Sequence, residues 1–145
     1  MIIRDQGSTK ALAVRLVAAL LCVGVAVIHV IDQGGIPGSK TPGYVGIGYW
    51  ILELVAVLTA VWLIASQAKA PWGIALGVAA GPLIGYVLSR GPGLPDYSDD
   101  KGNWAEPLGV LSLVVELALL ILAAVALGRT APASLRGSRK SATRE

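Results

Sequence analysis

"GYWILELVAVLTAVWLI", residues 48–64, is a long apolar stretch with a single charged residue, Glu53. A second stretch, "LGVLSLVVELALLILAAVAL" at 108–127, has the same character and again contains one charge, Glu116. The chain as a whole is 54% hydrophobic and 14% charged, whereas about a quarter of the residues in an average soluble domain are charged. The sequence therefore predicts a membrane protein, and the two glutamates inside apolar stretches are its most unusual feature.

Four segments are long enough to cross a bilayer, which takes about 20 apolar residues. We expect transmembrane helices at about 12–31, 44–65, 72–89 and 107–127. The first is interpreted as a true helix, because its apolar run is long for a secretory signal and "VIHVIDQ" is not a small-residue cleavage site. The predicted fold class is all-α: a polytopic four-helix bundle occupying 1–128, followed by a basic cytoplasmic tail, 129–145, that we expect to be disordered.

The distribution of lysine and arginine predicts the orientation, because basic segments stay in the cytoplasm. One side carries nine basic residues: Arg4, Lys10, Arg15, Lys69, Arg129, Arg136, Arg139, Lys140 and Arg144. The loops at 32–43 and 90–106 carry three: Lys40, Arg90 and Lys101. Both termini are therefore expected in the cytoplasm, with the protein in the cell (inner) membrane. The lipid bilayer is the expected partner, and nucleic-acid binding is not, because the tail has no aromatic residues for stacking and no motif.

The two halves of the chain resemble each other. The first and third spans end in "HVIDQGGIPG" and "YVLSRGPGLP", and an alignment places Gln33 opposite Arg90. The glutamates lie at equivalent positions of the following spans, about 13 Å from the outer ends of their helices. We interpret this as two repeated helical hairpins related by an axis along the membrane normal, with chance similarity of apolar helices as the alternative. Such a repeat would place Glu53 and Glu116 face to face.

Glycine recurs at every fourth position of the third span, at Gly73, Gly77, Gly81 and Gly85. A ridge of small residues lets another helix backbone approach closely in the membrane. We expect this ridge to pack inside the bundle. The alternative is an interface in a homodimer or a larger membrane complex.

The glutamates define the candidate site. A charged side chain at the bilayer centre costs about 2.5–3.5 kcal/mol on insertion scales, so each carboxyl needs a partner, a proton or an aqueous pocket. Each has a hydroxyl one turn outward on its own helix, from Tyr49 and Ser112 respectively. The residues predicted to form an outer-half layer that binds a ligand or a proton are His29, Glu53, Tyr86, Arg90 and Glu116.

Three interpretations of this layer stay open. Glu53 with Arg90 or His29 forms a buried pair that fixes helix register, or the layer is a functional pocket that opens outward, or it contacts a partner subunit. A metal ion is a weak candidate ligand, held by His29, Glu53 and Glu116, because one imidazole and two carboxylates suit a hard or borderline divalent ion. No cofactor is identified by the sequence.

No nucleotide-binding, nucleophile-elbow or zinc-protease motif is present, and no arrangement selects a catalytic triad. An enzyme is therefore the third hypothesis. The leading one is an integral membrane protein that binds a small ligand, metal ion or proton, and the second is a non-catalytic accessory or structural subunit of a larger complex.

The loop "PDYSDDKGNW", residues 95–104, is interpreted as a solvated surface loop because it lacks the ligand spacing of a calcium-binding loop. Aromatic residues near the span ends are predicted to anchor the helices at the membrane interfaces. On the outer side these are Tyr44, Trp50, Tyr97 and Trp104, and on the inner side Trp62 and Trp72.

The segment "GYVLSRGPGLPDYSDDKGNWAEPLGVLSLVVE", residues 85–116, resembles a pattern found in small four-helix bacterial integral membrane proteins. The pattern is Ser-Arg at the end of the third helix, Gly-Leu-Pro, an acidic insert, a tryptophan, Pro-Leu-Gly and a glutamate in the fourth helix. Its residues here are Ser89, Arg90, Gly93, Leu94, Pro95, Trp104, Pro107, Leu108, Gly109 and Glu116. The resemblance, with "HVIDQGG" added, extends over most of 29–116. It implies the four-helix membrane fold and no particular activity.

Overall fold

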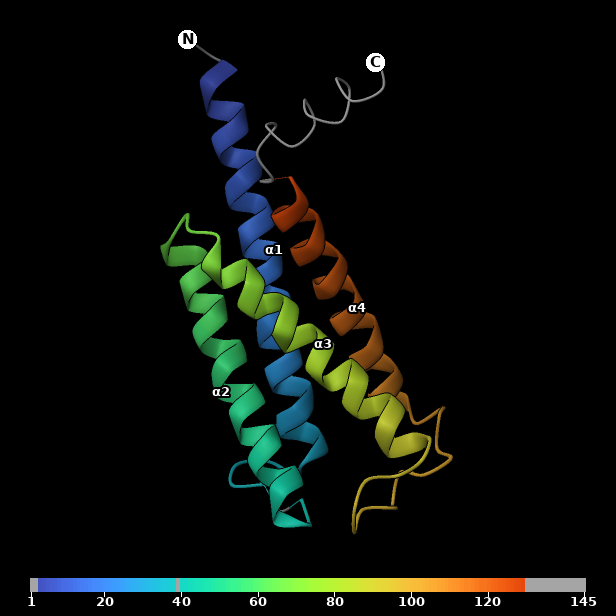
Figure 1. The fold of residues 1–145 in the computed structure, drawn as a ribbon. Coiled ribbons are helices and arrows are strands. Elements are labelled where there is room, and N and C mark those ends of the chain that lie inside the picture. The colour runs from blue at the N-terminus through green and yellow to red at the C-terminus, as the bar shows by residue number, and fades with distance from the viewer. Residues whose placement is uncertain (1–2, 39, 130–145) are drawn as a thin grey trace, which may run out of the picture.

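The computed structural model describes residues 3–38 and 40–129, which form four helices and no strand. They are α1 (Ile3–Asp32), α2 (Gly43–Ala65), α3 (Ala70–Arg90) and α4 (Pro107–Gly128), as Figure 1 shows. The all-α, four-helix prediction is confirmed. Helix α1 begins well before the predicted start, because no proline interrupts the polar segment that precedes its apolar part. The predicted disordered tail lies outside the described residues from residue 130 onward.

All four helices are long and apolar enough to cross a membrane. Large apolar side chains point away from the protein on every helix, for example Leu20, Ile51, Ile84 and Ile121. So much outward-facing apolar surface would be unfavourable in water, whereas lipid is its natural environment. The chain is a multi-pass membrane protein.

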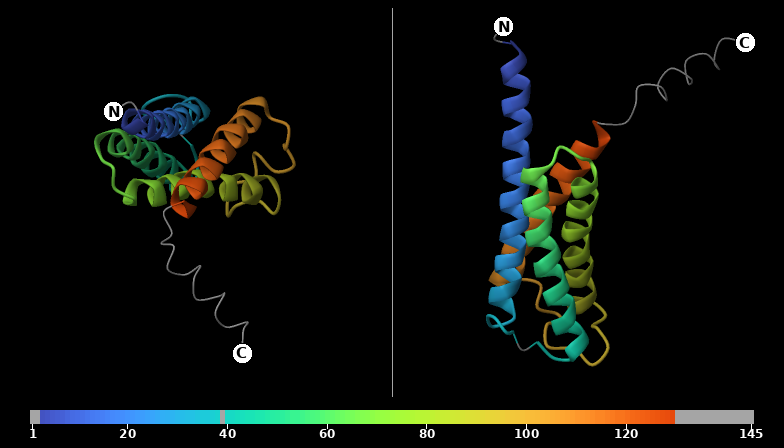
Figure 2. Two further views of the ribbon diagram at one scale, coloured as in Figure 1. Left: turned by 90° about the horizontal axis from the view of Figure 1, so that it is seen from above. Right: turned by 90° about the vertical axis from the view of Figure 1, so that its left-hand side faces the viewer.

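The helices form two antiparallel hairpins. Helix α1 packs mainly against α2, and α3 mainly against α4; α1 and α4 join the hairpins, while α2 and α3 contact each other less. Figures 1 and 2 show that α1 starts and α4 ends at the same end of the bundle, here called the terminal end. The loops 33–42 and 91–106 lie at the opposite end, here called the loop end.

Alanine dominates the packed core. Most of its buried members are small: Ala18, Ala19, Cys22, Ala26, Ala56, Ala60, Ala75, Ala79 and Ala123. Small side chains allow helix backbones to approach closely, which drives helix association where lipid removes the hydrophobic effect. The close packing expected of this bundle is therefore present, but alanine provides it.

The glycine ridge does not enter this core and makes no close contact with another of the described helices, so the prediction that it packs inside the bundle is wrong; its last two members, Gly81 and Gly85, line the cavity described below. Gly73, Gly77 and Gly81 are exposed, and Gly85 is half-buried. A Cβ atom added at any of the four would meet nothing within 4 Å. Two residues along an α-helix correspond to a rotation of about 200°, so the face of Ala75 and Ala79 that enters the core turns the glycines away from it.

Arg15 links α1 to the end of α2 at the terminal end of the bundle. Its Nη1 donates to the carbonyl of Leu63, at 3.1 Å, and to that of Ser66, while its guanidinium lies 6.0 Å from the centre of the Trp72 ring. A cation at the end of α2 satisfies carbonyls that have no partner within that helix. Trp72 is buried, unlike the interface anchor that the sequence predicted, whereas Trp62 is exposed.

Candidate functional site

Arg90, the last residue of α3, holds the loop 91–106 against the bundle. Its Nε donates to the carbonyl of Asn103 at 3.0 Å, and its own carbonyl accepts from the amide of Gly102 at 2.8 Å. The guanidinium also lies 3.6 Å from a carboxylate oxygen of Asp100 and 3.7 Å from one of Glu106. The loop therefore returns over the end of the helix that precedes it.

These contacts overturn the predicted pairing of Arg90 with Glu53. The loop supplies two carboxylates of its own, at Asp100 and Glu106, and both lie within ion-pair range of the guanidinium. Arg90 is buried and makes a further hydrogen bond to the hydroxyl of Ser89, at 3.2 Å. Its hydrogen bonds and ion pairs with the described residues lie within α3 and the loop.

The loop 91–106 is not solvated throughout, because the side chain of Tyr97 is buried. The Tyr97 hydroxyl donates to Asp100 at 2.9 Å, and its backbone pairs with that of Leu94. Burial, with the nearby Asp100 carboxylate, raises the pKa of Tyr97 above its ordinary value. The prediction of Tyr97 as an exposed interface anchor is wrong, whereas Trp104 is exposed as expected.

Glu106 and Gly109 shape the start of α4. The Glu106 carboxylate accepts from the amides of Leu108, at 2.9 Å, and Gly109, at 2.5 Å, which caps the helix. A Cβ atom at Gly109 would lie 2.8 Å from Nη2 of Arg90 and 2.9 Å from Cε2 of Tyr86. A side chain at this position would have to displace the ends of these side chains, so glycine favours the close approach of α3 and α4 here.

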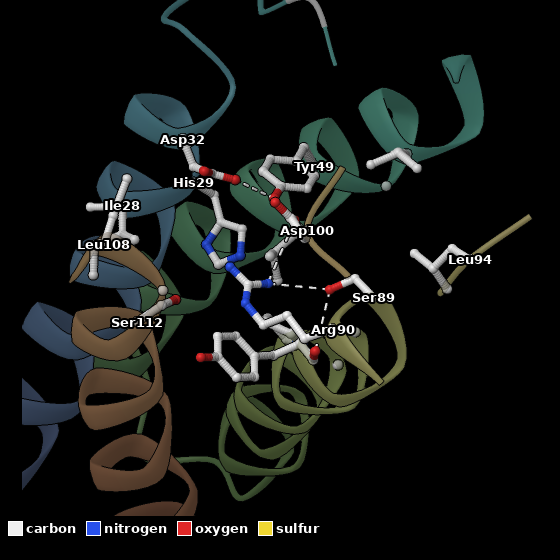
Figure 3. A pocket seen from close by; sticks show the side chains of 18 of the residues that line it. Ile28, His29, Asp32, Tyr49, Ser89, Arg90, Leu94, Asp100, Leu108 and Ser112 are labelled. Carbon is white, nitrogen blue, oxygen red and sulfur yellow. Dashed lines mark hydrogen bonds and ion pairs between the residues drawn. The ribbon is translucent and has the colours of Figure 1, made fainter. Parts of the chain in front are cut away.

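A cavity of about 320 Å³ opens among these elements at the loop end. All four helices and the loop 91–106 line it, and every tyrosine of the chain and its single histidine are among the lining residues. Figure 3 shows His29, Tyr49, Arg90, Asp100 and Ser112 converging on it from different segments. Of the predicted site residues, four line the cavity: His29, Tyr86, Arg90 and Glu116.

His29 and Glu116 meet at the cavity across the α1–α4 interface. Nδ1 of His29 lies 2.9 Å from the carbonyl of Val25, so this nitrogen carries a proton and donates it. The other ring nitrogen, Nε2, lies 3.9 Å from Oε1 of Glu116. The same Oε1 accepts from the Ser112 hydroxyl at 2.5 Å, so the predicted hydroxyl partner of Glu116 is confirmed.

Glu53 is buried too, but it does not line the cavity. Its Oε1 accepts a 2.7 Å hydrogen bond from Nε2 of Gln33, the first residue after α1. Gln33 is 3% exposed, and its Oε1 is buried without a hydrogen-bond partner. The predicted hydroxyl partner is wrong here, because the Tyr49 hydroxyl donates to Asp32 instead.

Sequence reasoning missed Gln33 as a partner, although the repeat alignment placed it opposite Arg90 and so gave a signal. The two halves use these equivalent positions differently. Gln33 is hydrogen-bonded to Glu53, the glutamate of its own hairpin. Arg90 is hydrogen-bonded to the loop instead, and the neighbour of Glu116 from another helix is His29. The proposed face-to-face arrangement of the glutamates is therefore not what the side chains form.

The weak metal hypothesis is also wrong for this arrangement. His29, Glu53 and Glu116 do not gather, and the described residues contain no group of three or more His, Cys, Asp or Glu side chains that could hold a metal ion. Glu53 is hydrogen-bonded to Gln33 at the end of α1. Of the three proposed metal ligands, one imidazole and one carboxylate therefore remain at the cavity.

Comparison of the chain with known proteins gives no further indication: no protein-family model, no curated protein and no solved structure matches it. The cavity geometry is therefore the basis for inferring a function.

Proposed function

We propose that the protein binds a small molecule in the cavity at the loop end, and that this end faces away from the cytoplasm. The observation that carries the proposal is the cavity itself, about 320 Å³ in volume and lined by all four helices. Small-molecule sites are typically concave, mostly apolar and supplied with a few convergent polar groups. Nine of the twelve lysines and arginines belong in sequence to the N-terminal segment, the connection between α2 and α3 and the C-terminal segment, which supports the orientation.

The lining residues suggest how a ligand is held. His29 and Glu116 supply polar contacts between the helices, the tyrosines supply amphipathic walls, and Arg90 keeps the loop 91–106 in place beside them. Binding is favoured over catalysis because the acidic groups nearest the loop are already engaged: Asp32 by Lys40, at 3.1 Å, and Glu106 by the start of α4. A polar ligand without metal ions fits this lining best.

The test is recovery of a bound molecule from protein purified in native lipid nanodiscs, identified by mass spectrometry. Gly85→Leu would introduce a large side chain at the cavity, because Gly85 lines it and has open space around its Cβ position. Gly73→Leu is the matched control, since it adds the same group to the same helix at a glycine that does not line the cavity. The proposal expects loss of the molecule in Gly85→Leu alone; equal retention in both variants would contradict it.

A second candidate function is that of a subunit in a homodimer or a larger membrane complex. It is favoured by the exposed glycine row of α3, because small residues are the usual contact points between transmembrane helices. Native mass spectrometry from nanodiscs distinguishes the two, since a complex would be lost in Gly73→Leu, whereas a cavity ligand would not.

A further inference from the structure

We infer that the ligand of this cavity is an organic cation, namely a primary or secondary ammonium group on a compact apolar or aromatic body. The inference rests on the proposed function and specifies its ligand class. It is drawn from the charge of the lining, the engagement of Arg90 and the geometry of His29 and Glu116.

The lining has an excess of acidic groups. Four carboxylates line the cavity, those of Asp32, Asp100, Glu106 and Glu116, and Arg90 is the single lysine or arginine in the lining. A cavity with this balance attracts cations and repels anions, and low-dielectric walls strengthen the effect. An anionic ligand would have Arg90 as its single lysine or arginine partner in the lining, beside four carboxylates.

Arg90 already has anionic partners of its own. Its guanidinium donates to Asn103 and Ser89, lies near Asp100 and Glu106, and stacks 3.9 Å from the centre of the Tyr86 ring. A carboxylate or phosphate at this guanidinium would compete with the two loop carboxylates that already lie within ion-pair range of it.

Glu116 is the carboxylate with the greatest need for a cation. It is 1% exposed, and within the described residues no lysine or arginine lies in ion-pair range of it. Buried charges are normally paired. Asp32 has Lys40, whereas Asp100 and Glu106 share Arg90. Glu116 accepts a hydrogen bond from Ser112, and Nε2 of His29 lies 3.9 Å from its Oε1.

His29 leaves room for a donor between itself and Glu116. Because Nδ1 donates to Val25, Nε2 of the neutral imidazole is an acceptor, and it faces an acceptor oxygen 3.9 Å away. That separation is too long for a direct hydrogen bond. One ammonium nitrogen, with two N–H groups, can donate to both atoms at ordinary distances of about 2.8–3.0 Å.

The remaining walls suit the body of such a ligand. Apolar side chains of Ile28, Leu52 and Leu108 share the lining with the four tyrosines. Aromatic rings attract an ammonium group through their π-faces. A bare metal ion would leave these walls without contacts and would lack ligands, since no metal-binding cluster is present among the residues described.

The test uses three probes of the same shape and different charge on the full-length protein in nanodiscs. They are 2-phenylethylammonium, 2-phenylethanol and 3-phenylpropionate, and their binding is measured by titration calorimetry at constant ionic strength. The ammonium is expected to bind at least about tenfold more tightly than the alcohol, with the anion weakest. Glu116→Gln should weaken ammonium binding by about tenfold or more, because it removes the charge and keeps the shape.

Glu53→Gln is the matched control, because it neutralises the other intramembrane glutamate outside the cavity. It should leave ammonium affinity within about twofold of the wild type. If Glu116→Gln does not fold, the three-probe series on the wild-type protein decides the question without it.

Tighter or equal binding of the alcohol or the anion would overturn the cation assignment and leave the ligand site standing. Undiminished ammonium binding in Glu116→Gln would also overturn it. Failure of the ammonium probe to bind would overturn this inference, whereas the proposed function is judged separately, by recovery of a bound molecule from nanodiscs.

Discussion

At the scale of single residues, Arg90 connects three features of the loop end. It receives the loop backbone at Gly102 and Asn103, lies beside two loop carboxylates, and stacks on Tyr86, whose hydroxyl donates to the carbonyl of Trp104 at 2.6 Å. A guanidinium suits this position because its planar group of donors serves several acceptors at once. Arg90 therefore makes several of the contacts that hold the loop wall of the cavity, and Tyr86 adds another.

We predict that Arg90→Gln lowers the free energy of unfolding by about 2–3 kcal/mol, because it breaks several charge-assisted contacts. Chymotrypsin should also cleave faster after Tyr97, which is buried in the intact loop. Denaturation in mixed micelles and timed proteolysis measure the two effects. Lys101→Gln, which removes an exposed cation from the same loop, serves as the control and should change neither; equal behaviour of the two variants would refute the assigned role of Arg90.

The second residue-scale prediction concerns Gln33 and Glu53. Gln33→Leu should destabilise the protein by about 1–3 kcal/mol, because it leaves a buried carboxyl without its donor. The double variant Gln33→Leu with Glu53→Leu should cost less than the sum of the single changes, since both polar groups are then gone. Unfolding free energies from a double-mutant cycle provide the measurement. Additive effects, within about 0.5 kcal/mol, would show that the hydrogen bond contributes no coupling.

The sequence predicted which polar residues enter the bundle better than it predicted their partners. Glu53 and Glu116 are both buried, as the cost of lipid exposure required. The partner of Glu53, Gln33, lies in the loop after α1, and Arg90 contacts the loop 91–106. Loop paths follow from contacts distant in the sequence. The pairing of Arg90 with loop carboxylates, which removed it from the glutamates, could not be read from the spacing of residues along the helices.

At the scale of elements, α3 presents two kinds of small residue on two faces. Its alanines enter the core, whereas its glycines face away from it. Both residues permit close helix contact, so composition alone could not distinguish the faces. The apolar character of the whole helix removes the amphipathic pattern that would reveal the buried side of a helix in a soluble protein.

Glycine-to-alanine substitutions test this assignment. Gly77→Ala should leave the free energy of unfolding unchanged or raise it by up to about 1 kcal/mol, because the new methyl group enters open space in a helix. Gly109→Ala, the comparison variant, should lower it by about 1–3 kcal/mol, because its Cβ would collide with Arg90 and Tyr86. Similar destabilisation by both would indicate that another helix covers the glycine row.

At the scale of the whole molecule, the two ends of the bundle are built differently. At the terminal end, Arg15 of α1 is hydrogen-bonded to the end of α2, next to an alanine-rich core. The loop end contains the cavity. The four spans and their hairpin order were predictable, because blocks of apolar residues about 20 long have few alternatives in a membrane. The cavity was not predictable. It lies at the loop end, where α2 and α3 are further apart than at the terminal end (Figure 1), and no local sequence pattern encodes that separation.

The orientation of the molecule is tested by chemical labelling in intact cells. Asp99→Cys, at the loop end, should react with a membrane-impermeant maleimide from outside, whereas Lys69→Cys, at the other end, should react only after permeabilisation. Cys22, the single native cysteine, is buried and should give little background. A reporter fused after Glu145 should behave as cytoplasmic. The reverse pattern would invert the proposed topology and place the cavity toward the cytoplasm.

The packing toward the terminal end also has a consequence for movement of a ligand across the bilayer. Ala18, Cys22, Ala56, Leu63 and Leu119 are fully buried in the core, and none of them lines the cavity. Under the proposed function, a ligand bound at the loop end would be held there in this conformation. Carrying it to the other side of the membrane would require the core contacts of these residues to separate.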